Sequence, residues 1–348
     1  MKKICFLFGS SSFEHEVSVT SLRSVLMAYE TTKFEIAIAG LDKKNTLQFF
    51  DKGVFLKRFS SYGSFDLADC PAPFDALKHF DAVFPLVHGG FGEDGSIQGL
   101  LNLLAVPFVG PSVLSSAICF DKDTAKKLLD QKGIKVVPWI CLSPNDQVNE
   151  KEIEEKIGYP CFVKPSASGS SCGVSKVLQK SDLMQAIHFA RGFSSKVLIE
   201  KAIEGMELEC AVLGSEKLIT SKVGRIIPKN AFYDYEAKYV LPDGAEIEAP
   251  ANIDENLEQY IQTVSRQVFR ALDCEMMARI DFFYDGNLYL NEVNTIPGFT
   301  PISLYPTLLG LSGINYNELL DNLFRLAIDR FDRKAPQDLR LPIAQCPL

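Results

Sequence analysis

The sequence lacks the signatures of several common protein classes. Its 348 residues include nine Cys, but no two of them have the Cys-x-x-Cys spacing of a structural zinc site. The number of Cys is odd and most lie in apolar runs, so we expect reduced thiols in a cytoplasmic protein. Positive charge is also scarce. The net charge of −8 argues against sequence-independent nucleic-acid binding, which needs a basic surface.

A long apolar run is missing as well. The most apolar internal stretch, 100–120, is interrupted by Asn102, Pro107, Gly110 and Pro111, so it does not predict a membrane span. Two lysines open the chain, but the apolar run after them is short and is soon followed by acidic residues. We therefore interpret residues 3–8 as a first strand rather than a signal peptide, and we expect no membrane partner.

Neither of two familiar nucleotide-binding motifs is present. The turn at 9–12 after the first strand has no Gly-x-Gly-x-x-Gly pattern, which counts against a nicotinamide oxidoreductase. The small-residue run at 166–173 follows Lys164 but has no Gly-Lys-Ser/Thr ending, so it is not a Walker A loop. Small residues let backbone N–H groups approach an anion closely. Taken alone, this run also fits an ordinary flexible hairpin loop.

The alternation of strands and helices predicts an α/β protein of three domains, at 1–111, 112–204 and 205–348. The first domain has a β-α-β rhythm, which predicts a parallel sheet with helices on both faces. A loop-rich insertion is expected at 43–75. Expected strands lie at 3–8, 34–41, 81–87, 106–109, 136–142, 161–164, 174–178, 196–200, 207–213 and 217–223, and expected helices at 14–29, 95–104, 121–131, 149–157, 182–191 and 254–272.

The pair Asp285-Gly286 lies between two alternating segments and predicts a β-hairpin. A two-residue turn would pair Asp281 with Leu290 and Arg279 with Glu292. Because paired side chains share a face, a polar face and an apolar face follow. The polar face would carry Arg279, Asp281, Glu292 and Asn294, and the packed face Ile280, Phe282, Tyr284, Tyr289 and Val293.

Two carboxylates and an amide oxygen on one face suit magnesium, which takes one or two protein carboxylates together with substrate phosphates. The competing interpretation is an Arg279–Glu292 ion pair with Asp281 and Asn294 merely exposed. A three-residue turn would put Glu292 on the other face from Asp281, so the metal hypothesis depends on the type of turn.

Three further segments carry weaker signals. A strand ends at Glu200-Lys201, where backbone groups could contact an adenine, although an ordinary strand end looks the same. Glu14 at a helix start would repel phosphate and could hold an ammonium group, but helix-dipole carboxylates are common there. Glycines after His88 mark the carboxyl end of a strand, where open α/β sheets bind ligands. A lone histidine at such a place is more often structural than catalytic.

The order of these segments resembles that of the D-alanine–D-alanine ligase family of the ATP-grasp superfamily. The resemblance implies an ATP-grasp fold, in which an N-terminal parallel α/β sheet is joined by two α+β domains that clasp ATP. It covers nearly the whole chain, and the runs at 232–239 and 291–298 are its most specific parts. The matching segments are 14–18, 88–95, Lys164-Pro165 with 169–171, Glu200-Lys201, 232–239, 279–281 and 291–300.

The resemblance implies a nucleotide site and a metal site. Two magnesium ions, with manganese as an alternative, would be held by Asp281, Glu292 and Asn294. The loop 169–173 would close over the γ-phosphate of ATP. The implied ATP-binding residues are Lys122, Lys164, Ser171, Glu200, Lys201, Ile203, Glu207 and Lys238.

The resemblance also implies an amino-acid site. Glu14 would bind the ammonium of the first D-alanine, and Ser170 and Tyr239 would join Glu14 in a bridge that closes the site. Arg279 and the Gly298 N–H would stabilise the tetrahedral intermediate. Substrate-binding roles are further implied for His88, Ser303 and Leu304, with the last two at the carboxylate of the second D-alanine.

The expected reaction is formation of D-alanyl-D-alanine through an acyl phosphate, with release of ADP and phosphate, for peptidoglycan synthesis. A D-alanine–D-lactate ligase and another carboxylate–amine ligase are the alternatives, and Tyr239 matches the dipeptide-forming type. The family implies a homodimer. A non-catalytic nucleotide-binding relative would be expected to lose metal ligands, and none is lost here.

Overall fold

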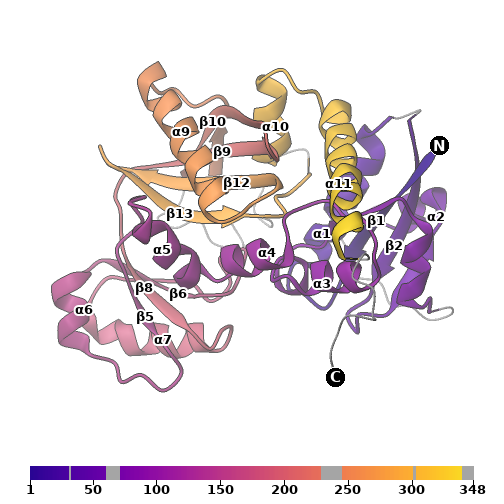
Figure 1. Ribbon diagram of the computed structural model, residues 1–348. Helices are drawn as coiled ribbons and strands as arrows, with labels where there is room; N and C mark the ends of the chain where they lie inside the picture. Colours follow the sequence, from indigo (N-terminus) through magenta and orange to yellow (C-terminus); the bar gives the residue numbers. More distant parts are fainter. Residues whose placement is uncertain (31–32, 60–70, 229–244, 301–302, 339–348) are drawn as a thin grey trace, which may run out of the picture.

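The computed structural model describes residues 1–30, 33–59, 71–228, 245–300 and 303–338. In that part of the chain the strands form three sheets of four, four and five strands. Figure 1 shows the first sheet at the right, the second at the lower left and the third at the top. The expected Lys238 and Tyr239 lie outside the described residues.

The first sheet has the order β3-β2-β1-β4, and β1 is parallel to both of its neighbours. The predicted parallel sheet is therefore confirmed. The loop-rich insertion was wrong in part, because an edge strand antiparallel to β2 and a short helix occupy residues 47–58. The elements are β1 (Lys2–Gly9), β2 (Phe34–Leu41), β3 (Leu47–Phe50), α2 (Lys52–Arg58), the 3₁₀ turn η1 (Phe74–His79) and β4 (Ala82–Leu86).

Both faces of this sheet are covered by helices, as predicted. Side chains alternate along β1, so Phe6 and Phe8 belong to one core and Cys5 and Leu7 to another. The first core includes buried residues of α1 (His15–Ala28) and α11 (Tyr316–Asp338), and the second includes α3 (Ser96–Leu103). The expected strand at 106–109 is reduced to a single parallel bridge between Phe108 and Val83.

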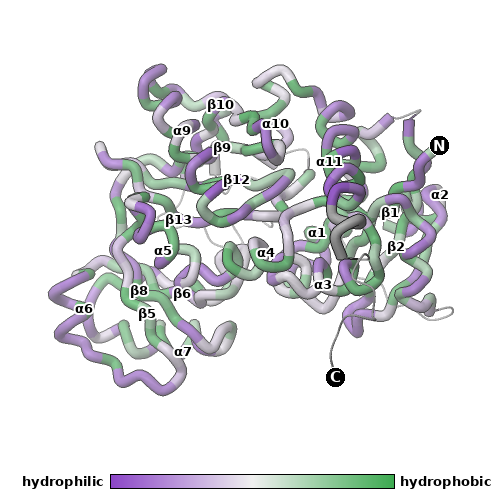
Figure 2. Tube along the Cα trace, in the orientation of Figure 1, coloured by the Kyte–Doolittle hydropathy of each residue, from purple (hydrophilic) through white to green (hydrophobic). Residues whose placement is uncertain are grey.

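The second sheet is antiparallel, in the order β5-β8-β6-β7. Its core joins Val163 and Ile199 of the strands to Ile153 and Ile187 of two helices. Figure 2 shows α6 as a hydrophilic surface helix and α4 as hydrophobic. The elements are β5 (Trp139–Leu142), α6 (Glu150–Lys156), β6 (Cys161–Pro165), β7 (Ser175–Val177), the 3₁₀ turn η3 (Lys180–Asp182), α7 (Leu183–Arg191) and β8 (Val197–Lys201).

The third sheet has the order β11-β10-β9-β12-β13, and all of its pairs are antiparallel. Helix α9 is capped by Asp254 and buries Leu257, Ile261, Val264 and Val268 at helical spacing. The elements are β9 (Met206–Gly214), β10 (Leu218–Pro228), β11 (Ala245–Glu248), α9 (Glu255–Ala271), β12 (Met276–Tyr284), β13 (Leu288–Asn294) and α10 (Leu304–Leu311).

Packing crosses the expected domain boundaries in two places. Helices α4 (Val113–Phe120) and α5 (Lys122–Gln131) share their core with the third sheet. Helix α11 packs on the first sheet through Phe324, whose ring contacts those of Phe6 and Phe84. Arg330 of α11 donates hydrogen bonds to the carbonyls of Gly110 and Phe108 at 2.7 and 2.8 Å. The boundaries at 111 and 204 stay predictions.

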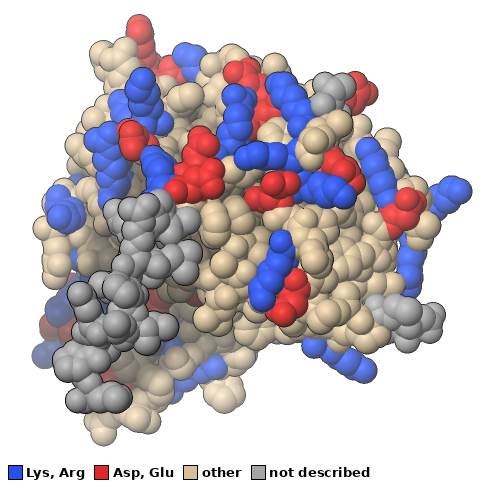
Figure 3. Space-filling view, turned by 45° about the vertical axis from the view of Figure 1, so that its right-hand side comes forward, with Lys and Arg blue, Asp and Glu red and all other residues tan. Residues whose placement is uncertain are grey.

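The surface carries charges of both signs. On the face in Figure 3, Lys and Arg lie interspersed with Asp and Glu, and the described residues there form no continuous basic surface. None of the helices in the described ranges has the length and apolarity needed to cross a bilayer. Seven Cys of the described part are free thiols.

Candidate active site

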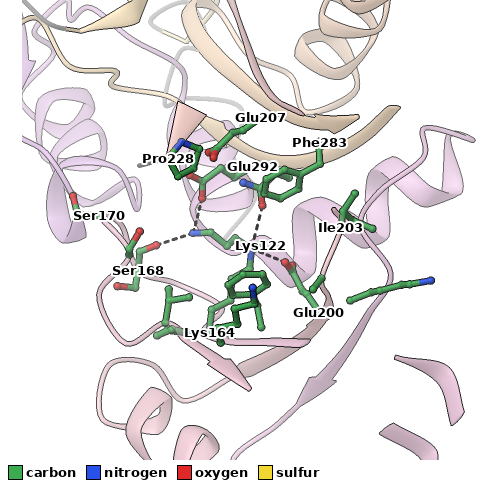
Figure 4. A pocket seen from close by; sticks show the side chains of 18 of the residues that line it. Lys122, Lys164, Ser168, Ser170, Glu200, Ile203, Glu207, Pro228, Phe283 and Glu292 are labelled. Atoms are coloured by element: carbon green, nitrogen blue, oxygen red, sulfur yellow. Dashed lines mark hydrogen bonds and ion pairs between the residues drawn. The ribbon is translucent and has the colours of Figure 1, made fainter. Parts of the chain in front are cut away.

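A cleft of about 340 Å³ lies between the second and third sheets. Its floor comes from β6, its following loop and β8, and its roof from β9, β10 and the β12–β13 hairpin (Figure 4). Most of the expected nucleotide residues meet here, and Lys238 falls outside the described part of the chain. The expected residues that line the cleft are Lys122, Lys164, Ser170, Ser171, Glu200, Lys201, Ile203, Glu207 and Glu292.

The β12–β13 hairpin corrects the predicted register. The turn has three residues, 285–287, because Tyr284 pairs with Leu288. A β-bulge follows at Asn291, so that Asp281 lies opposite Glu292 rather than Leu290. The third turn residue and the bulge each shift the register by one residue. Because side chains alternate with a period of two, the two shifts together return Asp281 and Glu292 to one face. Tyr289 pairs with Phe283, so its predicted place on the packed face was wrong.

Arg279 binds two buried carboxylates at the inner end of this hairpin. Its guanidinium donates two hydrogen bonds to Asp281, at 2.8 and 2.7 Å, and lies 2.9 Å from Glu209 Oε2. Burial alone would lower the pKa of Arg279, but the charges of Asp281 and Glu209 raise it well above its ordinary value. The competing interpretation, an Arg279–Glu292 pair beside an exposed Asp281, was wrong, because Asp281 is only 2% exposed.

The donor set at the hairpin fits magnesium. Asp281 and Glu292 are direct cross-strand partners, so their carboxylates can reach one ion. The Asn294 amide lies beside them and donates to Asp281 Oδ2 at 2.8 Å. Among the described residues no third His, Cys, Asp or Glu completes an all-protein metal cage. Two carboxylates and an amide leave coordination positions for phosphate oxygens and water, as magnesium requires.

Lys122 connects the hairpin to the small-residue loop. It is the first residue of α5, whose cap Asp121 accepts a hydrogen bond from Thr124 N–H and another from Ser166 Oγ. The Lys122 ammonium lies 3.3 Å from Glu292 Oε2 and donates to the Ser168 carbonyl at 2.7 Å, as the dashed lines in Figure 4 show. A cation therefore stands between the loop and a predicted metal ligand.

Glu200 is held between two lysines at the back of the cleft. Lys164 lies 2.7 Å from one of its carboxylate oxygens, and Lys126 lies 3.0 Å from the other. Burial alone would raise the pKa of Glu200, but the charges of Lys126 and Lys164 outweigh burial and hold it below its ordinary value. Burial lowers the pKa of Lys126 to about 8. At this end of the cleft the charges are buried and paired with each other.

Glu14 contacts the small-residue loop from the first domain. Ser170 Oγ donates a hydrogen bond to Glu14 Oε1, so this part of the predicted bridge is formed. Glycines on both sides make the contact possible. A Cβ at Gly89 would lie 2.2 Å from Glu14 Oε2, and a Cβ at Gly169 would lie 2.7 Å from it. Tyr239, the third member of the predicted bridge, lies outside the described residues.

Two neighbours of Glu14 differ in character. His88 is buried, its Nδ1 contacts the Ile296 carbonyl at 3.1 Å and its Nε2 contacts Ser21 Oγ at 2.8 Å. Burial lowers the pKa of His88 to about 4, so the ring is neutral at neutral pH. Glu93 accepts the Gly89 N–H at 2.9 Å. Burial and the nearby Glu14 carboxylate raise the pKa of Glu93 to about 8.

The loop after β13 brings Gly298 against the start of α10. Ser303 is the residue before α10, and its Oγ accepts the Thr300 N–H at 2.9 Å. A Cβ at Gly298 would lie 2.7 Å from that Oγ, so glycine permits the approach. The Leu304 side chain is buried against Ile226. Any contact of Leu304 with a carboxylate would therefore use its backbone N–H, where helix starts favour anions.

Three residues beside the expected site were missed. Asn291 Oδ1 accepts from Lys164 at 3.2 Å, and the bulge that turns it toward the cleft has no sequence signal. Lys126 lies on the buried side of α5, where an amphipathic pattern predicts apolar residues. Glu93 stands inside the matching segment 88–95, so an acidic residue after the glycines was the available signal.

The fold is that of the ATP-grasp class. Family models described as "D-ala D-ala ligase N-terminus" and "D-ala D-ala ligase C-terminus" match residues 3–111 and 128–325. The D-alanine–D-alanine ligase of Oceanobacillus iheyensis is 40% identical over 95% of this chain and 96% of its own length. D-alanine–D-alanine ligase A of Chromobacterium violaceum is 40% identical over 94% of this chain and 95% of its own.

Solved structures agree with these matches. The VanG D-Ala:D-Ser ligase of Enterococcus faecalis has a TM-score of 0.81 at 37% identity, covering 94% of this chain and 99% of its own. The D-alanine–D-alanine ligase of Bacillus anthracis in complex with ATP has a TM-score of 0.76 at 28% identity, covering 96% and 99%. The chain therefore belongs to the D-alanine–D-alanine ligase family.

Proposed function

We propose that this chain is an ATP-dependent ligase that joins two D-alanine molecules into D-alanyl-D-alanine. Family membership supports the reaction class. The observation that carries the proposal is that Glu292, the cross-strand partner of Asp281, lines the same cleft as Lys122 and Lys164. Carboxylates for a divalent cation and lysines for phosphates are the parts that phosphoryl transfer needs.

The lysines must exchange partners when the nucleotide binds. Lys122 lies near Glu292, and Lys164 is bound to Glu200 and Asn291. Phosphate oxygens would attract both ammonium groups, and backbone N–H groups of the loop 169–173 would face the γ-phosphate. Glu200, Lys201 and Ile203 would contact the adenine, and Glu207 the ribose. Lys238 is assigned to the phosphates on the resemblance alone.

Asp281, Glu292 and Asn294 would hold magnesium, with manganese as an alternative. The bound ion would neutralise charge on the phosphoryl oxygens during transfer. Arg279 then has two tasks. It holds Asp281 in place through two hydrogen bonds, and its charge would stabilise the oxyanion. The Gly298 N–H would be the second donor to that oxyanion.

The reaction proceeds in two displacements. The carboxylate of the first D-alanine, with its ammonium on Glu14, attacks the γ-phosphorus and ADP leaves. The neutral amine of the second D-alanine, with its carboxylate near Ser303 and the Leu304 N–H, then attacks the acyl carbon. Arg279 and the Gly298 N–H stabilise the tetrahedral oxyanion, the amine nitrogen loses a proton, and phosphate leaves.

The acyl phosphate must be kept from water, because hydrolysis would waste it. The Ser170–Glu14 hydrogen bond supports a closed loop over the site, and Tyr239 would complete that bridge. His88 would act indirectly, since its ring nitrogens bond to Ser21 and Ile296. We further propose a cytoplasmic homodimer, for which the free thiols and the family offer support.

A second candidate concerns the second substrate alone. The structural likeness to VanG, a D-Ala:D-Ser ligase, favours D-serine as that alternative, and D-lactate remains the hydroxyl alternative. ADP release should be measured with ATP, magnesium and D-alanine, with L-alanine as control, and the products separated. Dipeptide from D-alanine supports the proposal, whereas product formed only with added D-serine or D-lactate replaces it. No D-alanine-dependent ADP release contradicts it.

A further inference from the structure

Phe13 and Phe193 form an aromatic contact beside the hydrogen bond between Glu14 and Ser170. Phe13 precedes Glu14, and its side chain is 73% exposed. Its ring lies 5.9 Å from the ring of Phe193, which follows α7 in the unit formed by the second sheet and its helices. Phe193 in turn lies 5.4 Å from Phe189 of α7 in an edge-on arrangement. Adjacent residues 13 and 14 thus contact different parts of that unit.

Phe193 also packs against Gly173 in the small-residue loop. Gly173 closes that loop with a φ of +76°, and a Cβ there would lie 2.6 Å from Phe193 Cδ2 and 2.7 Å from Pro165 Cγ. The ring therefore packs directly on the loop's last residue. Ser170, three residues earlier, bears the hydroxyl that binds Glu14. A change at the Phe13–Phe193 contact would reach both sides of the Glu14–Ser170 hydrogen bond.

We propose that Phe13 and Phe193 are positioning residues that hold the loop 168–173 closed over the acyl-phosphate site. The inference rests on the proposed function and adds an apolar contact to its polar bridge. Neither ring lines the nucleotide cleft, so their role is exerted through Glu14 and the loop. The Glu14–Ser170 hydrogen bond alone is polar and open to competition from water. An aromatic pair beside it is not.

Loss of the aromatic contact should uncouple the two displacements. When the loop opens early, water attacks the acyl phosphate and regenerates D-alanine and phosphate, so ADP forms without dipeptide. A pair of this kind changes an open–closed equilibrium by roughly fivefold. We expect the ratio of ADP to dipeptide to rise by roughly threefold or more in Phe13→Ala and Phe193→Ala. The KM for D-alanine should also rise.

The experiment measures ADP and dipeptide in the same reaction for each variant. Phe13→Tyr keeps the ring and should retain the wild-type ratio. Tyr260→Ala removes an exposed aromatic from α9 and is the matched control, with no expected change. The double variant Phe13→Ala/Phe193→Ala should be no worse than Phe193→Ala alone, because Phe193→Ala already removes the contact with Phe13.

A wild-type ratio and KM in Phe13→Ala would overturn the inference, and Phe13 is exposed enough that this variant should fold. If the wild type itself shows no D-alanine-dependent ADP release, the proposed function has failed. Whether Phe13 and Phe193 interact is then tested by thermal unfolding of the same variants. Stability losses that add in the double variant overturn the contact, and a double loss smaller than the sum supports it.

Discussion

The nucleotide cleft and the region around Glu14 arrange charge in opposite ways. In the cleft each buried acid has a cation beside it: Lys126 and Lys164 for Glu200, and Arg279 for Asp281. Around Glu14 the nearby acid is Glu93, whose carboxylate accepts a backbone N–H and forms no ion pair with the residues that the structure describes, although the charge of Lys122 acts on it from a distance. Both glutamates are buried, but the charges of Lys126 and Lys164 hold the pKa of Glu200 below its ordinary value, whereas burial and Glu14 raise the pKa of Glu93.

This difference indicates which kind of ligand each region suits. In the cleft the cations are paired with carboxylates, and anionic phosphates would compete for the same cations. Two neighbouring carboxylates repel each other, and a ligand carrying a positive charge would relieve that repulsion. The first region thus suits a polyanion with its metal, and the second suits an ammonium group. Three substitutions would break or sharpen this contrast.

The largest effect is expected from Asp281→Asn. The substitution removes a charged ligand that Arg279 and Asn294 orient, and loss of several kcal/mol of transition-state stabilisation lowers kcat/KM by more than about a hundredfold. The matched control is Asp285→Asn in the turn of the same hairpin, which should stay within about twofold of the wild type. Both are measured by steady-state ADP release over a magnesium titration. An active Asp281→Asn enzyme would remove the metal assignment.

Lys126→Met should have the next largest effect, on stability. Lys126 is 1% exposed, and its loss leaves Glu200 with Lys164 as its remaining cation. Removing one partner of a buried pair should reduce the free energy of unfolding by about 2 kcal/mol or more. Lys127→Met, one residue on, removes an exposed lysine that pairs with Asp123, and should cost less than about 1 kcal/mol. Urea denaturation compares them. Equal losses would mean that the buried pair has no special weight.

The smallest effect, and the most diagnostic for the Glu14 region, is that of Glu93→Gln. The folded-state pKa of Glu93 is raised from 4.5 to about 8 by burial and by Glu14, so the folded protein holds a proton that the unfolded chain has released. Wild-type stability relative to Glu93→Gln should therefore fall as the pH rises from about 5 to 8, and level off above that. Glutamine keeps an acceptor for the Gly89 N–H.

Thermal unfolding at pH 5 and pH 8 measures this difference. Glu35→Gln is the control, because Glu35 is exposed in its pair with Lys3. Its effect should be the same at both pH values. A pH-independent difference for Glu93→Gln would show that Glu93 is ionised in the folded protein, and the contrast between the two regions would disappear.

Local patterns predicted much of the fold and the polar face of the hairpin. Alternation along residues 279–284 requires Arg279 and Asp281 to share a face, whatever lies at the turn. The register was not predictable, because the preference of Asp-Gly for two-residue turns is a tendency that Asn287 can override by joining the turn. The bulge at Asn291 is linked to Lys164 on another sheet, a contact that no local pattern contains.

Long-range burial explains the other differences. Lys126 occupies a position that helical periodicity reserves for apolar residues, and its partner Glu200 is 74 positions away in the chain, as the numbering shows. The edge strand β3 and helix α2 were hidden in a segment rich in turn-forming residues. Their formation depends on packing of Phe50 and Phe55 against Phe8 of the first strand.

The return of α11 to the first sheet has a mechanical consequence. Phe324 packs helix α11 on the first sheet, Arg330 bonds it to Phe108 and Gly110, and α4 and α5 share the core of the third sheet. The first and third sheets are thus connected through shared packing. The unit of β5 to β8 has a core of its own and carries the small-residue loop. Substrate entry and product exit would then depend on movement of this one unit against the other two sheets, rather than on three independent lobes.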